Sequence, residues 1–210
     1  MDLKEYIEQN IIPLYEHFDK AHAVSHVRSV IERSERLAAQ YNVDRNMVYV
    51  IAAYHDVGLC EGREHHHRVS GEMLAADEVL RRWFSDEQIV VMREAVEDHR
   101  ASNHTPPRSL YGCIVAEADR LIDVDVTLRR TVQYGLAHLT TLDREIHYKR
   151  FVEHLVEKYA EGGYLRLWLP DSENVRPLEE LRCIIADKKL LRSRFDNLFD
   201  EELKSRTDYL

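Results

Sequence analysis

Residues 47–56 read Met47-Val48-Tyr49-Val50-Ile51-Ala52-Ala53-Tyr54-His55-Asp56, and they are the most informative stretch of this chain. The run before His55 is almost wholly apolar, which predicts a buried helix. The polar pair that closes the run needs an explanation, because a buried carboxylate must be paired with another group or coordinated to a cation. His55 and Asp56 are therefore candidate metal ligands.

Matching groups occur in other parts of the chain. Imidazoles and carboxylates that come singly from separate helices form a ligand set for one or two divalent ions of the Mn, Fe, Co, Ni or Zn type, with Mg as a further option. We therefore expect a metalloenzyme. The predicted metal ligands are His26, His55, Asp56, His67, His99 and Asp119.

Helical periodicity indicates that these side chains point inward. Residues at steps of three, four and seven share one face of a helix, so His26 shares its face with Val30 and Leu37. His99 and Asp119 lie on apolar stripes of their own helices by the same spacing. The predicted ligands are thus directed into the interior.

The order of these residues resembles the signature of the HD-domain superfamily, all-helical proteins of which most characterised members are metal-dependent phosphohydrolases. The resemblance rests on His26, on His55-Asp56 and on the closing segment Glu117-Ala118-Asp119-Arg120-Leu121. It covers residues 19–125 and implies a helical bundle that holds a first metal ion through His26, His55, Asp56 and Asp119.

The cluster His65-His66-His67 leaves the next ligand ambiguous. Adjacent residues on a helix point about 100° apart, so only one of the three should reach the site. The segment from His67 through Gly71 to Leu74 resembles the one that supplies a second-metal histidine in the two-metal branches of the superfamily. This resemblance selects His67, together with His99, and leaves His66 as the alternative. Whether one or two metal ions bind stays open.

The chemistry expected of such a site is phosphoryl transfer, with Asp56 and His22 as the candidate catalytic residues. Two cations can hold the attacking and leaving oxygens of a phosphoester in line, with Asp56 as the carboxylate that bridges them. His22 would protonate a leaving group or bind phosphate, or alternatively donate a hydrogen bond to a ligand carboxylate. Arginine forks suit phosphate oxygens, although arginines beside acidic residues also form structural ion pairs. The candidate substrate-binding residues are Arg63, Arg100 and Arg120.

Length and composition bound the class of protein. A chain of 210 residues is long enough for one domain with a sizeable core. We predict a single domain over residues 1–210, with the metal-site core at 19–125 and a helical extension at 126–210. Three widely spaced cysteines predict neither a disulfide framework nor a cysteine metal site. A net charge of −9 argues against a face that binds duplex nucleic acid, and no apolar run has the length of a membrane span.

Glycine and proline are scarce, at 7 and 5 residues, so most of the chain should be helix. We predict an all-α fold, an HD-type helical bundle with additional C-terminal helices. Asp44 and Ser85 are the expected N-caps, the latter with Gln88 in a capping box. Residues 102–107 should form a turn, and residues 161–170 an extended excursion or short hairpin. Helices are expected over 2–17, 21–41, 44–57, 66–83, 86–100, 108–123, 126–140, 143–160 and 177–199.

The resulting expectation is a cytoplasmic metal-dependent phosphohydrolase, a phosphomonoesterase or phosphodiesterase, whose partner is a small phosphorylated molecule such as a nucleotide. The chain lacks the acidic pair that guanosine tetraphosphate hydrolases of the superfamily carry after the HD dipeptide. It also lacks the Gly-Tyr-Pro element of the cyclic dinucleotide phosphodiesterases, so neither substrate is assigned. A di-iron oxygenase on the same scaffold and a non-catalytic nucleotide or metal sensor are the alternatives. The oligomeric state stays open, with a homodimer as one option.

Overall fold

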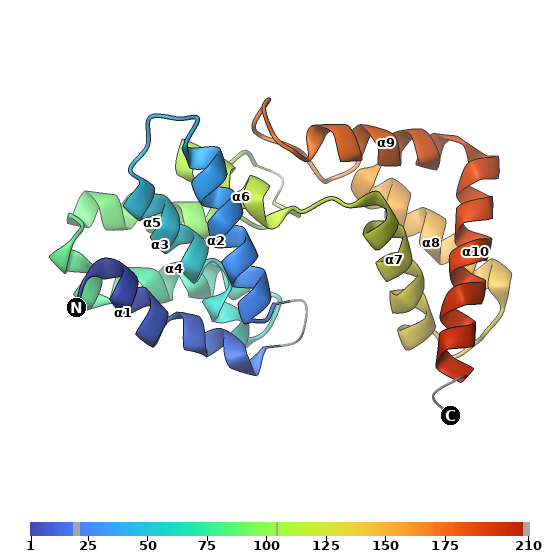
Figure 1. Ribbon diagram of the computed structural model, residues 1–210, viewed down its shortest axis with the longest axis horizontal. Helices are drawn as coiled ribbons and strands as arrows, with labels where there is room; N and C mark the ends of the chain where they lie inside the picture. The colour runs from blue at the N-terminus through green and yellow to red at the C-terminus, as the bar shows by residue number, and fades with distance from the viewer. Residues whose placement is uncertain (19–21, 104, 208–210) are drawn as a thin grey trace. The chain divides into compact units, whose positions relative to one another are not determined.

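The structure is a computed structural model that describes residues 1–18, 22–103 and 105–207. These residues form helices and connecting segments without any β-strand, which confirms the predicted all-α class (Figure 1). They divide into two compact units, and each is described by itself. The first unit comprises Met1–Arg120 and Trp168–Ser172; the second comprises Leu121–Leu167 and Glu173–Leu210. The predicted single domain stays a prediction.

The first unit contains six α-helices and three short 3-10 helices in its described part. In chain order these are α1 (Leu3–Asn10), η1 (Ile12–His17), α2 (Val24–Ala38), α3 (Arg45–Tyr54), η2 (Val57–Glu61), α4 (His66–Ala76), η3 (Glu78–Arg82), α5 (Asp86–Asp98) and α6 (Leu110–Asp119).

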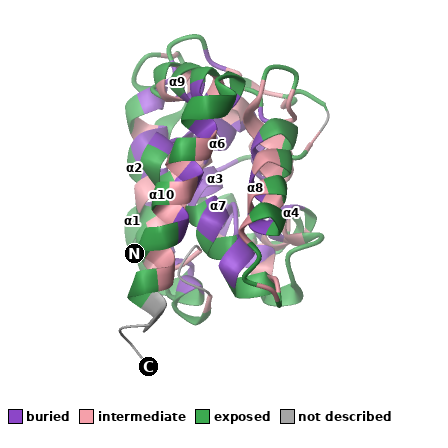
Figure 2. Cartoon of the chain, turned by 90° about the vertical axis from the view of Figure 1, so that its right-hand side faces the viewer, coloured by how far each residue is buried: buried purple, intermediate pink, exposed green. Residues whose placement is uncertain are grey.

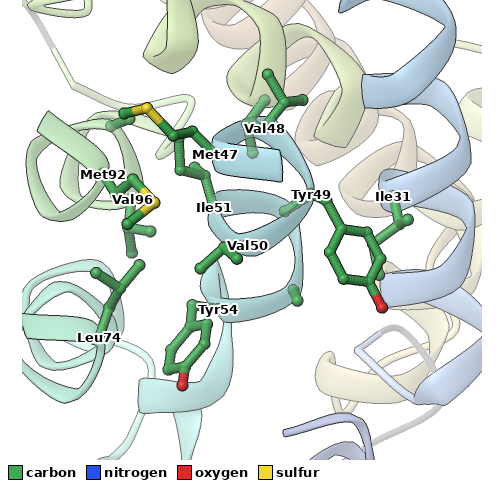
Figure 3. Close-up of a cluster of buried hydrophobic side chains, with 14 of the residues drawn as sticks. Ile31, Met47, Val48, Tyr49, Val50, Ile51, Tyr54, Leu74, Met92 and Val96 are labelled. Atoms are coloured by element: carbon green, nitrogen blue, oxygen red, sulfur yellow. The ribbon is translucent and has the colours of Figure 1, made fainter. Parts of the chain in front are cut away.

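Helix α3 is the centre of this unit. Asp44 caps its N-terminus, as predicted, by accepting hydrogen bonds from the backbone of Asn46 and Met47. Every residue from Met47 to Tyr54 is buried, because α3 contacts α2, α4, α5 and α6. Figure 3 shows its apolar side chains among Ile31, Leu74 and other residues of these neighbours. Burying one such side chain contributes about 1.5–3 kcal/mol, so the packing holds the C-terminal end of α3 firmly in the interior.

The second unit contains α7 (Val124–His138), α8 (Arg144–Tyr159), α9 (Val175–Ala186) and α10 (Lys188–Thr207). Each helix buries one face and exposes the other (Figure 2). In α8 the buried residues His147, Phe151 and Leu155 recur at steps of four, as expected for an amphipathic helix. None of the described helices combines the length and the apolar character that crossing a bilayer requires.

Several predicted helices are interrupted where a side chain bonds the backbone. The range 66–83 breaks at Asp77, whose carboxylate accepts hydrogen bonds from the Val79 backbone and from two tyrosine hydroxyls. The range 177–199 breaks at Asp187, which accepts from the backbone of Lys189 and Leu190. Aspartate competes for backbone donors in this way, and the breaks lack the glycine or proline that would announce them.

Other local predictions have mixed outcomes. The capping box of Ser85 and Gln88 is present. The range 2–17 changes from α-helix to 3-10 helix near Pro13, where the ring removes a backbone donor. Residues 102–107 are non-helical where they are described, as predicted, and position 104 lies outside the described residues. Residues 161–170 form an irregular connection rather than a hairpin.

Candidate metal centre

The His55-Asp56 pair lies in the turn between α3 and η2. The backbone leaves helical geometry at Asp56, which has φ −118° and ψ 3°. The His55 ring donates from Nδ1 to the carbonyl oxygen of Ala52 at 2.7 Å. This bond leaves Nε2 of His55 facing the interior of the unit as a lone-pair donor for a cation. Both side chains are buried, so any charge they hold needs a partner.

One oxygen of Asp56 faces the groups predicted to hold a first metal ion. Asp56 Oδ2 lies 3.3 Å from Nε2 of His55 and 3.6 Å from Nε2 of His26. Asp119 Oδ1 lies 3.2 Å from Nε2 of His26 and 3.9 Å from Nε2 of His55. His26 comes from the first turn of α2 and Asp119 is the last residue of α6. The structure thus brings all four predicted groups together.

The other oxygen of Asp56 faces a second pair of histidines. Asp56 Oδ1 lies 3.4 Å from Nε2 of His66 and 3.4 Å from Nε2 of His99. The two Nε2 atoms are 3.3 Å apart. His66 is the first residue of α4, and His99 caps the C-terminus of α5. Asp56 is therefore shared between two clusters, each with the geometry to hold a metal ion.

Three of the rings are oriented by hydrogen bonds from Nδ1 to the backbone. His66 donates from Nδ1 to the carbonyl of Arg63 at 2.8 Å, and His99 donates from Nδ1 to the carbonyl of Val96 at 2.6 Å. With His55, three imidazoles bond the backbone carbonyl three residues earlier. Such bonds orient the ring of a metal ligand and leave Nε2 available. The Nε2 atoms and the carboxylate oxygens around Asp56 can then all bind a positively charged ion.

The pKa values indicate where positive charge resides without metal. Burial opposes ionisation of Asp56, but attraction by His55 and hydrogen bonds from His26 and His99 hold its pKa well below the usual range. Burial also opposes protonation of His26, yet hydrogen bonds to Asp119 and Asp56 raise its pKa to about 9. At neutral pH a proton on His26 therefore lies between two carboxylates. A metal ion bound there would replace that proton.

The structure differs from the sequence prediction at His67, which is buried but is not part of either cluster. Helical register explains the difference. His66 and Ser70 share the face of α4 that packs against η2, where a Cβ on Gly58 would lie 2.3 Å from the His66 carbonyl oxygen. His67 instead shares a face with Gly71, whose nearest neighbours are Glu97 and Arg93 of α5. The Gly71 spacing therefore reflects helix packing, and the alternative, His66, stands beside Asp56.

Two of the predicted substrate-binding arginines lie near opposite clusters. Arg63 is exposed and donates to Nδ1 of His22 at 3.3 Å, and the ring of His22 lies 5.9 Å from that of His26. Arg100 is half-buried and donates to the carbonyl of Glu64 at 2.6 Å. Together with burial, Arg100 lowers the pKa of His67 to about 4. Cationic groups therefore accompany both sides of Asp56.

The third predicted arginine, Arg120, lies in the interior. Its guanidinium is buried and lies 5.9 Å from the centre of the Trp168 ring. The neighbouring Glu117 is fully buried and accepts a hydrogen bond from the Trp168 backbone at 2.9 Å. These contacts attach the segment Trp168–Ser172 to the end of α6, so they give Arg120 a structural role. Substrate contact by Arg63, Arg100 and Arg120 stays a prediction.

Sequence reasoning missed Tyr15, a buried residue of η1. Its hydroxyl donates to the carbonyl of Ala53 at 2.9 Å and accepts the backbone N–H of Asp56 at 3.2 Å. Burial and the charge of Asp56 raise the pKa of Tyr15 well above its usual value, so the hydroxyl keeps its proton. In the sequence, Tyr15 follows an apolar stretch and carries no signal beyond ordinary packing.

Comparison with a family model places both clusters inside one matched region. The family model of the HD domain matches residues 23–122, a range that contains every residue of the two clusters. Among solved structures, the chain is similar to a predicted HD superfamily hydrolase from an uncultured Thermotogales bacterium, with 22% identity and a TM-score of 0.49 over 74% of this chain and 94% of that one. No curated protein matches the sequence. The region of this chain that holds both clusters is therefore similar to an HD domain.

Proposed function

We propose that the protein is a metal-dependent phosphohydrolase that acts on a small phosphorylated molecule, a nucleotide or another phosphomonoester or phosphodiester. One observation carries the proposal. The two oxygens of Asp56 face different pairs of histidines, each at 3.3–3.6 Å. A carboxylate in this position could serve two cations at once, an arrangement that supports phosphoester hydrolysis in two-metal sites.

The donor set suits divalent metal ions. His26, His55, Asp56 and Asp119 would hold the first ion, and Asp56, His66 and His99 would hold the second. Mixed imidazole and carboxylate ligands are typical of Mn, Fe, Co, Ni or Zn sites. Such ions would polarise the phosphoryl group and lower the pKa of an attacking water. The full burial of His55 and the near-complete burial of His99 place this chemistry where electrostatic interactions are strong.

The residues at the rim would orient the phosphate. The Arg63 guanidinium bonds His22 beside the first cluster, and Arg100 lies beside the second. Guanidinium groups bind phosphate oxygens in a forked geometry and neutralise their charge. His22 would donate a proton to the leaving oxygen, or hold the phosphate, from its position next to His26. In this proposal the buried residues hold the metal ions, and the residues nearer the surface contact the substrate.

The test is hydrolysis by the Mn-loaded protein under anaerobic conditions, measured as phosphate release from nucleotides and sugar phosphates and as release of the alcohol or phenol from synthetic phosphodiesters. We expect turnover of at least one class, with no turnover by Asp56→Ala. Activity that strictly requires both iron and oxygen would replace the hydrolase by the oxygenase alternative. Tight nucleotide binding without turnover of any compound, at full metal loading, would favour the sensor.

A further inference from the structure

The turn that carries His55 and Asp56 is held by an unusual set of bonds. In a continued helix the Asp56 N–H would donate to the carbonyl of Ala52, four residues earlier. That carbonyl accepts the ring nitrogen of His55. The Asp56 N–H donates to the Tyr15 hydroxyl, which in turn donates to the carbonyl of Ala53. One buried hydroxyl therefore bonds both a backbone N–H and a backbone carbonyl of the turn.

The ring of Tyr15 is fixed as firmly as its hydroxyl. It is fully buried, and it packs edge-on against Phe18 at 5.4 Å between ring centres and lies 6.3 Å from the His55 ring. Tyr15 belongs to η1, outside residues 23–122 that match the HD domain. The N-terminal segment thus supplies a contact to the metal centre that the matched region lacks.

We propose that Tyr15 is a positioning residue of the metal centre, whose hydroxyl sets the orientation of the turn and thereby directs the two oxygens of Asp56 toward their separate histidine pairs. The inference rests on the metal-binding part of the proposed function. Asp56 donates to the hydroxyl from its own backbone N–H, one residue from the adjoining ligand His55. A rotation of that peptide would move both carboxylate oxygens, so both clusters depend on the bond.

Tyr54 offers a matched control. It directly precedes His55, it is buried, and its hydroxyl is also hydrogen-bonded, but that hydroxyl donates to Asp77 rather than to the turn. Asp77 keeps the hydroxyl of Tyr6 as a second donor at 2.6 Å. Tyr15→Phe and Tyr54→Phe therefore each delete one buried hydroxyl and keep the ring. A purely structural effect should lower the melting temperature in both variants, whereas a positioning effect should appear in Tyr15→Phe alone.

The experiment has one readout without metal and one with it. In the metal-free protein, hydrogen exchange at the Asp56 amide should be faster in Tyr15→Phe than in the wild type or Tyr54→Phe. In titrations with Co²⁺, Tyr15→Phe should bind about 10-fold or more weakly, as expected for loss of a contact that supports a ligand. Its visible ligand-field spectrum should also change. Tyr54→Phe should keep the wild-type affinity and spectrum.

Two results would overturn the inference while leaving the proposed function intact. Unchanged exchange at the Asp56 amide in Tyr15→Phe would show that the hydroxyl does not hold the turn. Faster exchange with wild-type affinity and spectrum for Co²⁺ would show that the turn does not direct the ligands. A wild-type protein that binds no Co²⁺ would instead refute the metal centre, and the positioning role with it.

Discussion

The two sides of Asp56 differ in charge and in construction. The Oδ2 side combines two carboxylates with His26 and His55, contributed by helix ends that pack around α3. Among the residues that the structure describes, the Oδ1 side has no further carboxylate in its cluster and depends on His66 and His99. A larger number of anionic ligands favours a divalent cation, so the Oδ2 side should bind its ion more tightly than the Oδ1 side. The Oδ1 side should be the one that small changes of packing disrupt.

The largest effect should follow when the shared residue is removed. Asp56→Ala deletes the only carboxylate common to both clusters, so metal content after loading should fall from about two ions per chain to about none, and phosphate release by several orders of magnitude. Elemental analysis of the loaded, desalted protein measures the first quantity. Retention of one full equivalent by Asp56→Ala would show that His26, His55 and Asp119 suffice and that the two sides are independent.

A change confined to the Oδ1 side should separate the sides. His66→Ala should lower the metal content from about two ions to about one and strongly reduce hydrolysis, because it removes one of two imidazoles from the weaker cluster. His67→Ala is the adjacent control and should keep both ions, since His67 lies outside the clusters. The reverse pattern, with His67 essential and His66 dispensable, would contradict the register of α4 in the structure.

This contrast also marks the limit of prediction from sequence. The Oδ2 side could be predicted because each of its groups ends or begins a distinct helix with a clear apolar period, as at His55-Asp56 and Asp119. The choice among the three adjacent histidines could not be predicted, because their side chains differ only by a rotation about the α4 axis. That rotation depends on contacts of Gly58 with Ser70, twelve positions apart. The local sequence pattern also gives no indication of a role for Tyr15, because that role depends on the folded turn.

Gly58 should therefore control the Oδ1 side from a distance. A Cβ at this position would lie 2.3 Å from the His66 carbonyl oxygen and 2.6 Å from the Ser70 backbone nitrogen, so Gly58→Ala must push η2 and α4 apart. We expect a loss of about 1–3 kcal/mol in the free energy of unfolding. We also expect weaker binding of the second metal ion, measured by calorimetric titration. Ser70→Ala, which removes only the hydroxyl bond to Gly58, is the milder control. Equal weakening of both ions in Gly58→Ala would contradict the division into two sides.

Proton binding gives a further effect, and it again distinguishes the two sides. Hydrogen bonds to Asp119 and Asp56 outweigh burial and raise the folded pKa of His26 to about 9, against 6.5 as the ordinary value. A raised pKa stabilises the metal-free fold fully below pH 6.5, and this stabilisation disappears as the pH rises through about 9. The change is on the order of 3 kcal/mol.

Burial and His99 lower the pKa of His66 below the ordinary value of 6.5, so this residue is neutral in the folded state and largely neutral in the unfolded state above about pH 7.5, and it does not lower stability as the pH rises. Melting temperatures of the chelator-treated protein between pH 6.5 and 9 should therefore fall in the wild type and in His66→Gln, but much less in His26→Gln. Loaded protein should show the opposite trend, because metal binding must displace the His26 proton and strengthens as that proton leaves. Equal slopes in the two glutamine variants would show that the proton is not held on the Oδ2 side. The metal ion would then have no proton to replace there, and the charge difference between the two sides would rest on their carboxylates alone.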